Sequence, residues 1–187
     1  MSPVIQTLRQ EHRNIARLLA ALEHQVELVA EAKRPDYELL QDIAAYFCDY
    51  LDRCHHPKED AVFRQLQAKH PQEAQGIANL AQEHRDAAAR VHRFRDNIQA
   101  LFKDQVMPIT TLVSAARSFI DAERQHMRME ESAFFPVAEA KLSNEDWQCV
   151  ESALSHIHDP LFGATVEKNF MALLERLLAW ESEYAAG

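Results

Sequence analysis

Apolar side chains recur along the first 30 residues at alternating spacings of three and four, the pattern of a helix face packed inside a bundle. The positions that carry this pattern are Ile5, Leu8, His12, Ile15, Leu19, Leu22, Val26 and Val29. His12 is polar, although the spacing predicts an apolar residue there. The chain therefore begins with a long bundle helix whose buried face holds a histidine.

Three further segments show the same helical spacing, and each also has a histidine on its apolar face. They are the segment from Asp36 to Lys69 with His55, the segment from Pro71 to Lys103 with His84, and the segment opened by Pro108 with His126. Proline disfavours a helical residue before it but is tolerated in a first turn, so Pro35, Pro71 and Pro108 mark breaks and starts. The four segments predict an all-α, antiparallel up-down four-helix bundle.

The composition agrees with an all-α chain, because three glycines among 187 residues leave little material for the turns of a β protein. After about Leu142 the pattern changes. Ser143 and Asp146 have capping-box spacing and start a shorter helix, and a last amphipathic helix follows the loop 158–163. We therefore divide the chain into a four-helix bundle (1–142) and a C-terminal helical extension (143–187) packed on the bundle or on a partner subunit.

An internal repeat relates the two halves of the bundle as duplicated helical hairpins. Residues 10–13 (QEHR) recur as residues 82–85, and the His-x-x-x-Glu pattern of residues 55–63 recurs in residues 126–134. Within residues 1–142 the same shifts carry none of the remaining histidines onto a histidine; these are His24, His56, His70 and His92, whereas His156 and His158 lie beyond the two duplicated hairpins. The repeat thus selects His12, His55, Glu59, His84, His126 and Glu130.

These six side chains have the chemistry of a metal site. Residues four apart lie on one helix face, so each His-x-x-x-Glu motif offers an imidazole and a carboxylate to one point. With one histidine from each of the other two helices, the ligands converge on the centre of the bundle. Mixed imidazole and carboxylate ligands suit iron, manganese or zinc, and a carboxylate can bridge two cations. We therefore predict a dinuclear centre.

A purely structural role is the alternative, because a single histidine on a buried helix face is most often a satisfied core residue. Two glutamates inside one bundle favour metal, since buried charges are paired or bind cations. No lysine or arginine lies on the four apolar faces, although Lys58 is adjacent to Glu59. Whether Tyr46, Tyr50 or Cys54 joins the site is left open.

The motifs resemble those of the hemerythrin-like family, also called the HHE cation-binding domain. In order, they are Glu11-His12, His55-x-x-x-Glu59, Glu83-His84 and His126-x-x-x-Glu130, followed by Ala-Phe-Phe-Pro. The resemblance covers about residues 1–140. It implies two iron ions joined by an oxo or hydroxo bridge, with Glu59 and Glu130 as bridging ligands and the four histidines as terminal ligands. Manganese or zinc stay possible.

The sequence differs from that of the oxygen-carrying hemerythrins on the third helix. Those proteins place a second histidine four residues after the helix-three ligand, and here that position is Ala88. They also place an aspartate one position later than Glu130. The resemblance therefore favours a protein that binds or responds to dioxygen, nitric oxide or peroxide in sensing or stress response. The alternatives are an enzyme-like reduction of nitric oxide or peroxide, repair of iron centres, and a carrier or store of dioxygen or iron. We expect a sensor rather than an enzyme.

Composition limits the other partners and the location. A net charge of −9 argues against nucleic acid, because no basic stripe can neutralise phosphates. No apolar run reaches the roughly 18 residues of a membrane span, and no signal-peptide pattern is present. Three scattered cysteines are typical of reduced thiols. We expect a cytoplasmic protein that contacts neither membrane nor nucleic acid, with a homodimer possible.

Overall fold

Helices make up all the regular structure of the residues that the computed structural model describes, which are 2–77, 79–103, 107–154 and 156–185. The longer helices are α1 (Pro3–Ala30), α2 (Tyr37–Tyr50), α3 (His56–Lys69), α5 (Leu80–Phe102), α6 (Ile109–Met129) and α9 (Met171–Ala185). The shorter ones are α4 (Pro71–Gln75), α7 (Phe135–Lys141), α8 (Asn144–Leu154) and a 3-10 turn (Lys168–Phe170). The all-α prediction is confirmed.

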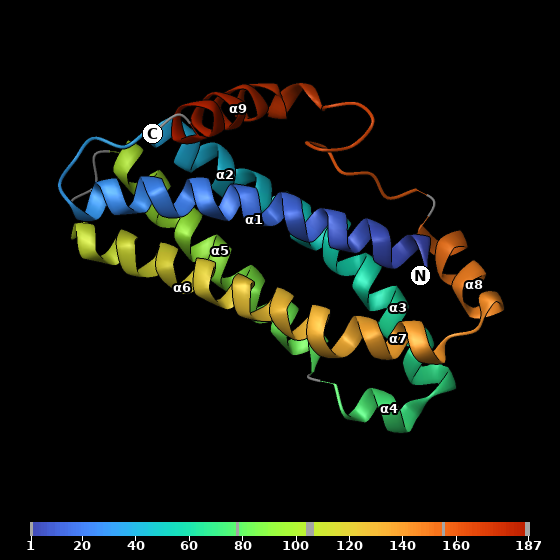
Figure 1. Cartoon of the computed structure of the whole chain (residues 1–187). Helices are drawn as coiled ribbons and strands as arrows, with labels where there is room; N and C mark the ends of the chain where they lie inside the picture. The colour runs from blue at the N-terminus through green and yellow to red at the C-terminus, as the bar shows by residue number, and fades with distance from the viewer. Residues whose placement is uncertain (1, 78, 104–106, 155, 186–187) are drawn as a thin grey trace.

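Two π-helical turns join helices end to end. Residues Leu51–His55 form the first, so that α2 continues into α3, and Glu130–Phe134 form the second, so that α6 continues into α7. α1 packs against α2 and α6, and α5 packs against the same two helices, which places four helical segments around one core. Figure 1 shows these segments lying along a common direction.

Side-chain caps start the helices where the sequence predicts starts. Asp36 accepts a hydrogen bond from the backbone N–H of Leu39 at 2.9 Å at the beginning of α2. Before α8, Asp146 N–H donates to Ser143 Oγ at 3.2 Å, and Ser143 N–H donates back to the Asp146 carboxylate at 3.0 Å. This reciprocal pair is the predicted capping box.

The predicted third helix is wrong at its beginning. A single helix was expected from Pro71 to Lys103, but α4 ends at Gln75 and a separate helix, α5, starts at Leu80. Gly76 is a poor helix former at this point. The side chain of Asn79 then caps α5 by accepting a hydrogen bond from the backbone N–H of the residue three positions on.

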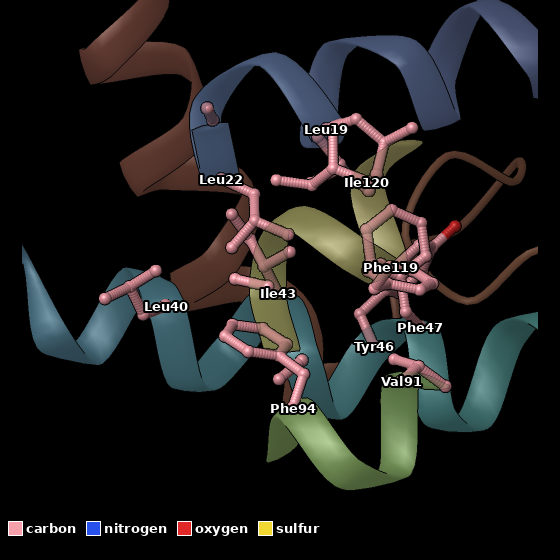
Figure 2. Packing of buried hydrophobic residues seen from close by; sticks show 14 of the residues in the cluster. Leu19, Leu22, Leu40, Ile43, Tyr46, Phe47, Val91, Phe94, Phe119 and Ile120 are labelled. Carbon is pink, nitrogen blue, oxygen red and sulfur yellow. The ribbon is translucent and has the colours of Figure 1, made fainter. Parts of the chain in front are cut away.

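Two apolar clusters lie along the bundle, one on each side of a polar layer. The first includes Leu22, Ile43, Phe47, Phe94 and Phe119. The second includes Ile5, Leu8, Val62, Leu66 and Phe134. Figure 2 shows side chains from α1, α2, α5 and α6 meeting in the first cluster. Along α1 the apolar face passes from the second cluster to the first through His12, so the polar layer lies where the predicted ligands are.

The residues after Leu142 pack on the bundle. α8 contacts α1 and α3, and α9 contacts α1 and α2, as Figure 1 shows. Leu161 and Leu177 are buried in the first apolar cluster. Arg17 of α1 donates two hydrogen bonds to Glu181 of α9, at 2.7 and 2.8 Å. The domain boundary at residue 142 itself stays a prediction. None of the described helices is both long and apolar enough to cross a membrane.

Candidate metal centre

The six residues that the repeat selects come together in the polar layer. α1 supplies His12, the first π turn and α3 supply His55 and Glu59, α5 supplies His84, and α6 with the second π turn supplies His126 and Glu130. None of the six is more than 7% exposed, and the two glutamates are fully buried. Two carboxylates without solvent need cations or protons, because unpaired buried charges are strongly unfavourable.

Glu59 lies at the centre of this cluster. Its Oε1 is 3.0 Å from Nε2 of His55 and 3.4 Å from Nε2 of His12, and its Oε2 is 3.3 Å from Nε2 of His84. Nε2 of His126 lies 4.0 Å from the same Oε2. One carboxylate therefore faces ring nitrogens from all four sides of the bundle.

Glu130 faces two of the same rings. Its Oε2 is 3.3 Å from Nε2 of His12, and its Oε1 is 3.4 Å from Nε2 of His126. The atoms left without a hydrogen-bond partner within the described chain include Nε2 of His12, His55, His84 and His126 and all four carboxylate oxygens of Glu59 and Glu130. Buried polar atoms are rarely left without a hydrogen-bond partner. A group of such nitrogen and oxygen atoms around one point is typical of metal ligands.

The donor atoms fall into two groups, each small enough to surround one cation. His12, His55, Glu59 and Glu130 offer atoms within 4.8 Å of one another, and so do His56, Glu59, His84 and His126. Glu59 belongs to both groups. The residues present therefore fit two neighbouring cations that share a carboxylate, with imidazole and carboxylate donors suited to first-row transition metals.

Each of the four predicted histidine ligands has an acidic residue behind it, at Nδ1. The pairs are Glu11 with His55 at 3.0 Å, Glu83 with His126 at 2.8 Å, Glu131 with His12 at 3.0 Å and Asp60 with His84 at 3.2 Å. A carboxylate at Nδ1 fixes the ring and its tautomer so that Nε2 is free to bind a metal. The four outer carboxylates thus orient the histidine rings toward the centre of the cluster.

These outer acids obey the same repeat as the ligands. Glu11 and Glu83 are related by its shift of 72, and Asp60 and Glu131 by its shift of 71. Sequence reasoning did not assign them a role. The signal was present, because each of the four stands next to a selected ligand residue along the chain.

Lys58 pairs with Glu11, not with its neighbour Glu59. Its ammonium contacts the Glu11 carboxylate, and both side chains are 7% exposed. Burial disfavours the charge of Glu11, but the hydrogen bond from His55 and the charges of His55 and Lys58 outweigh it and lower the pKa of Glu11. Within the described part of the chain, no lysine pairs with Glu59 or Glu130 at the centre.

In the metal-free protein, bound protons neutralise part of the negative charge of the central carboxylates. Burial opposes protonation of His55, but the Glu59 carboxylate and hydrogen bonds with Glu11 and Glu59 raise the pKa of His55 to about 10. Burial likewise opposes protonation of His84, and contacts with Asp60 and Glu59 raise its pKa to about 9. Burial and the Glu59 charge raise the pKa of Glu130 well above its usual value. Metal ions must displace these protons to bind.

Two of the three residues left open by the sequence lie away from the ring nitrogens. The hydroxyl of Tyr46 donates a hydrogen bond to Asp159 at 3.1 Å, and the thiol of Cys54 donates to the carbonyl of His158 at 3.1 Å. Both thus contact the C-terminal loop. Burial raises the pKa of the Cys54 thiol to about 11, so it is not a thiolate near neutral pH.

Tyr50 and Glu123 lie closer to the cluster. The Tyr50 ring stacks on His55 with centroids 5.9 Å apart, and its hydroxyl has no hydrogen-bond partner among the described residues. Burial, and then the Glu11 charge, raise the pKa of Tyr50. Glu123 is 1% exposed, and neither of its oxygens has a partner in the described part of the chain. Glu123 precedes His126 by one helical turn.

His56 is the residue that the repeat filter missed. Met127 stands at the repeat-related position, so the comparison of halves removed His56 from the candidates. The structure buries it at 3% exposure and stacks its ring on His84, with centroids 4.0 Å apart and an interplanar angle of 6°.

Two surface pockets reach the cluster. One, of 250 Å³, lies between α5 and α6 and is lined by Glu83, Ala87 and His126 among others. Another, of 390 Å³, is lined by His56 and His84 among others. Small molecules can therefore approach two of the predicted ligand residues, whereas His12 and His55 line neither of these pockets.

One of the comparisons with known proteins gave a match. A family model described as "Hemerythrin HHE cation binding domain" matches residues 4–138. Comparisons with curated proteins and with solved structures returned no match. The matched range contains every predicted ligand residue and His56, and it ends before α8.

Proposed function

Because this chain belongs to the hemerythrin HHE cation-binding domain family, we propose that it is a non-haem diiron protein that binds or responds to dioxygen, nitric oxide or peroxide. Family membership and the buried His/Glu clusters fit a metal-binding protein. The observation that carries the proposal is the pair of four-residue donor groups that share Glu59. Imidazole and carboxylate donors without thiolate suit iron.

The two donor groups divide the ions between the ends of the cluster. His12 and His55 would hold one iron, His84 and His126 the other. Glu59 supports a bridging role because it belongs to both groups. Glu130 belongs to the first group alone, so we assign it to the iron at His12 and His55, although the resemblance implies a bridge there too. When bound, the iron pair would supply one- or two-electron exchange with a small oxidant.

The chain's own residues prepare this site in three ways. The outer acids orient the imidazoles through Nδ1, which raises their basicity as ligands. Phe135 stacks on His12 with centroids 5.3 Å apart and, with the apolar cluster behind it, keeps bulk water from that side. The pockets beside His84 and His126 give a diatomic gas or peroxide a route to these two ligand residues.

Metal analysis of the purified protein, followed by anaerobic reduction and titration with dioxygen, nitric oxide and peroxide under absorption spectroscopy, tests the proposal. We expect about two iron ions per chain and a reversible spectral change with little turnover. Sustained consumption of nitric oxide or peroxide with a reductant would favour the enzyme-like alternative instead. Protein that takes up neither iron nor another transition metal would overturn the proposal.

A further inference from the structure

His56 carries a buried imidazole beside Glu59, His84 and His126. Neither ring nitrogen makes a hydrogen bond within the described residues, although the side chain is 4% exposed. The nearest acid, Asp52, lies 3.8 Å from Nδ1, beyond hydrogen-bonding distance. A buried polar group left unsatisfied costs about 1–3 kcal/mol, so this position needs an explanation.

The unsatisfied ring points to the same place as the other donors of its group. It lies parallel to His84 at 4.0 Å and edge-on to His126 at 5.9 Å between centroids. Its donor atom lies within 4.8 Å of those of Glu59, His84 and His126. Donors at roughly 2.1 Å from one cation are separated by at most roughly 4.2 Å, so a small contraction would bring these four around an ion.

The two donor groups would be unequal without this ring. The group at His12 and His55 contains both central glutamates, whereas the other contains only Glu59 in addition to its histidines. Removing His56 from the second group leaves it with three protein donors against four. Ala88, one turn after His84 on α5, offers no donor there and lines the same pocket as His56.

The π turn explains how adjacent histidines both face inward. In an α-helix consecutive side chains point about 100° apart, so only one of two neighbours normally faces a given core. Residues Leu51–His55 form a π turn that ends at His55, and π turns of this kind widen the helix and concentrate at functional sites. His55 and His56 are both buried on either side of this junction.

We propose that His56 is a seventh metal ligand, which completes a three-histidine site for the second cation together with His84, His126 and Glu59. This rests on the proposed dinuclear centre. The two ions are then unlike: one has three imidazoles and one carboxylate, and the other has two imidazoles and two carboxylates.

Two substitutions separate ligation from ring stacking. His56→Ala removes the ring, and His56→Phe keeps a flat ring on His84 but has no donor nitrogen. The matched control is His92→Ala, since His92 is 41% exposed in its side chain and belongs to neither donor group. Circular dichroism of each metal-free variant checks that it folds.

The readout is the binding of iron(II), and of cobalt(II) as a spectroscopic substitute, titrated against a chelator. We expect the His56→Ala and His56→Phe variants to lose at least about 100-fold in affinity for one ion, more than a lost outer-shell partner produces, while His92→Ala binds as the unsubstituted protein does. Unsubstituted protein that binds two ions, with a His56→Phe variant that binds both equally tightly, would overturn this inference alone. Unsubstituted protein that binds none would overturn the proposed function first.

Discussion

The two halves of the bundle carry the same predicted ligands in the same order, but their surroundings have diverged. In the first half the outer acid Glu11 is buried and paired with Lys58. In the second half the equivalent acid, Glu83, has a side chain 39% exposed, and Met129 stands where the repeat would place a lysine. The inner donors are thus retained while the shell behind them is free to change.

Solvent reaches the two halves differently. A pocket of 600 Å³ lies over the first half between α1 and the C-terminal loop, and of the site residues it is lined by the outer pair Glu11 and Lys58. The pocket over the second half is smaller and reaches His126 itself. We infer that one end of the centre is closed and that small molecules enter at the other.

The sharpest test of this asymmetry is to remove the two central glutamates one at a time. Glu59 belongs to both donor groups and Glu130 to one. We therefore expect Glu59→Ala to abolish binding of both ions, and Glu130→Ala to retain about one ion per chain, as measured by elemental analysis after desalting. Equal losses in the two variants would show that the glutamates are equivalent and that the donor groups do not differ.

The buried ion pair of the first half gives the next largest effect. Lys58→Met installs the side-chain type found at the repeat-related position, Met129, and leaves the buried Glu11 with His55 but without its lysine. Breaking a buried pair in this way destabilises a protein by about 3–5 kcal/mol. Denaturant unfolding of the metal-free protein measures the change. Lys69→Met is the control, because Lys69 is 56% exposed and its nearest acid is 3.8 Å away.

A loss below about 0.5 kcal/mol, as expected of an exposed control, would contradict the view that the first half depends on its buried pair. Met129→Lys adds the reciprocal change to the second half. It should not bring a comparable gain, because Glu83 already meets solvent.

The outer acids allow a direct comparison of the halves at the level of metal affinity. Glu11→Gln and Glu83→Gln each remove a charged acceptor from Nδ1 of a ligand histidine, His55 or His126. Loss of such a partner weakens metal binding about 10–100-fold. We expect the loss of metal affinity in Glu11→Gln to lie at the upper end of this range, because water cannot replace a buried carboxylate. The loss in Glu83→Gln should lie at the lower end. Chelator competition measures both, and the reverse order would break the comparison.

The inner donors were predictable because helical spacing and the repeat report on the same residues. His12, His55, His84 and His126 stand at positions where periodicity predicts apolar side chains, and duplication preserves them. His56 was not predictable in this way. A comparison of the two halves selects only residues that both halves share, and Met127 stands at the position related to His56. In addition, an unbroken α-helix would turn His56 away from the site that His55 faces.

Other features of the fold do not follow from the sequence pattern, for different reasons. The break before α5 depends on a side-chain cap at Asn79, whose local preference competes with a continuous helical pattern. The partner of Lys58 could not be read from its neighbour Glu59, because adjacent residues on a helix face different directions. Packing of the C-terminal loop on the first half depends on contacts between residues more than 100 positions apart, such as Tyr46 and Asp159.

The smallest expected effect concerns that loop, which contacts Tyr46 and Cys54 of the first half. The Tyr46 hydroxyl donates to Asp159 Oδ1, and the same oxygen accepts from the N–H groups of Leu161 at 2.8 Å and Phe162 at 2.9 Å. Tyr46→Phe removes one of these three bonds and leaves the turn its two backbone bonds. We therefore expect a loss of about 1 kcal/mol, with faster amide hydrogen exchange confined to the loop 156–165.

Tyr37→Phe is the control, because Tyr37 is 39% exposed. Metal binding should be unchanged in the Tyr46→Phe variant, because Tyr46 contacts the loop and not the central donors. Faster access of a small ligand to the reduced centre would show that the loop also closes the first half to solvent, and so would place a second entrance there. An unchanged rate, with exchange faster in the loop alone, would leave the two pockets that reach His84 and His126 as the route.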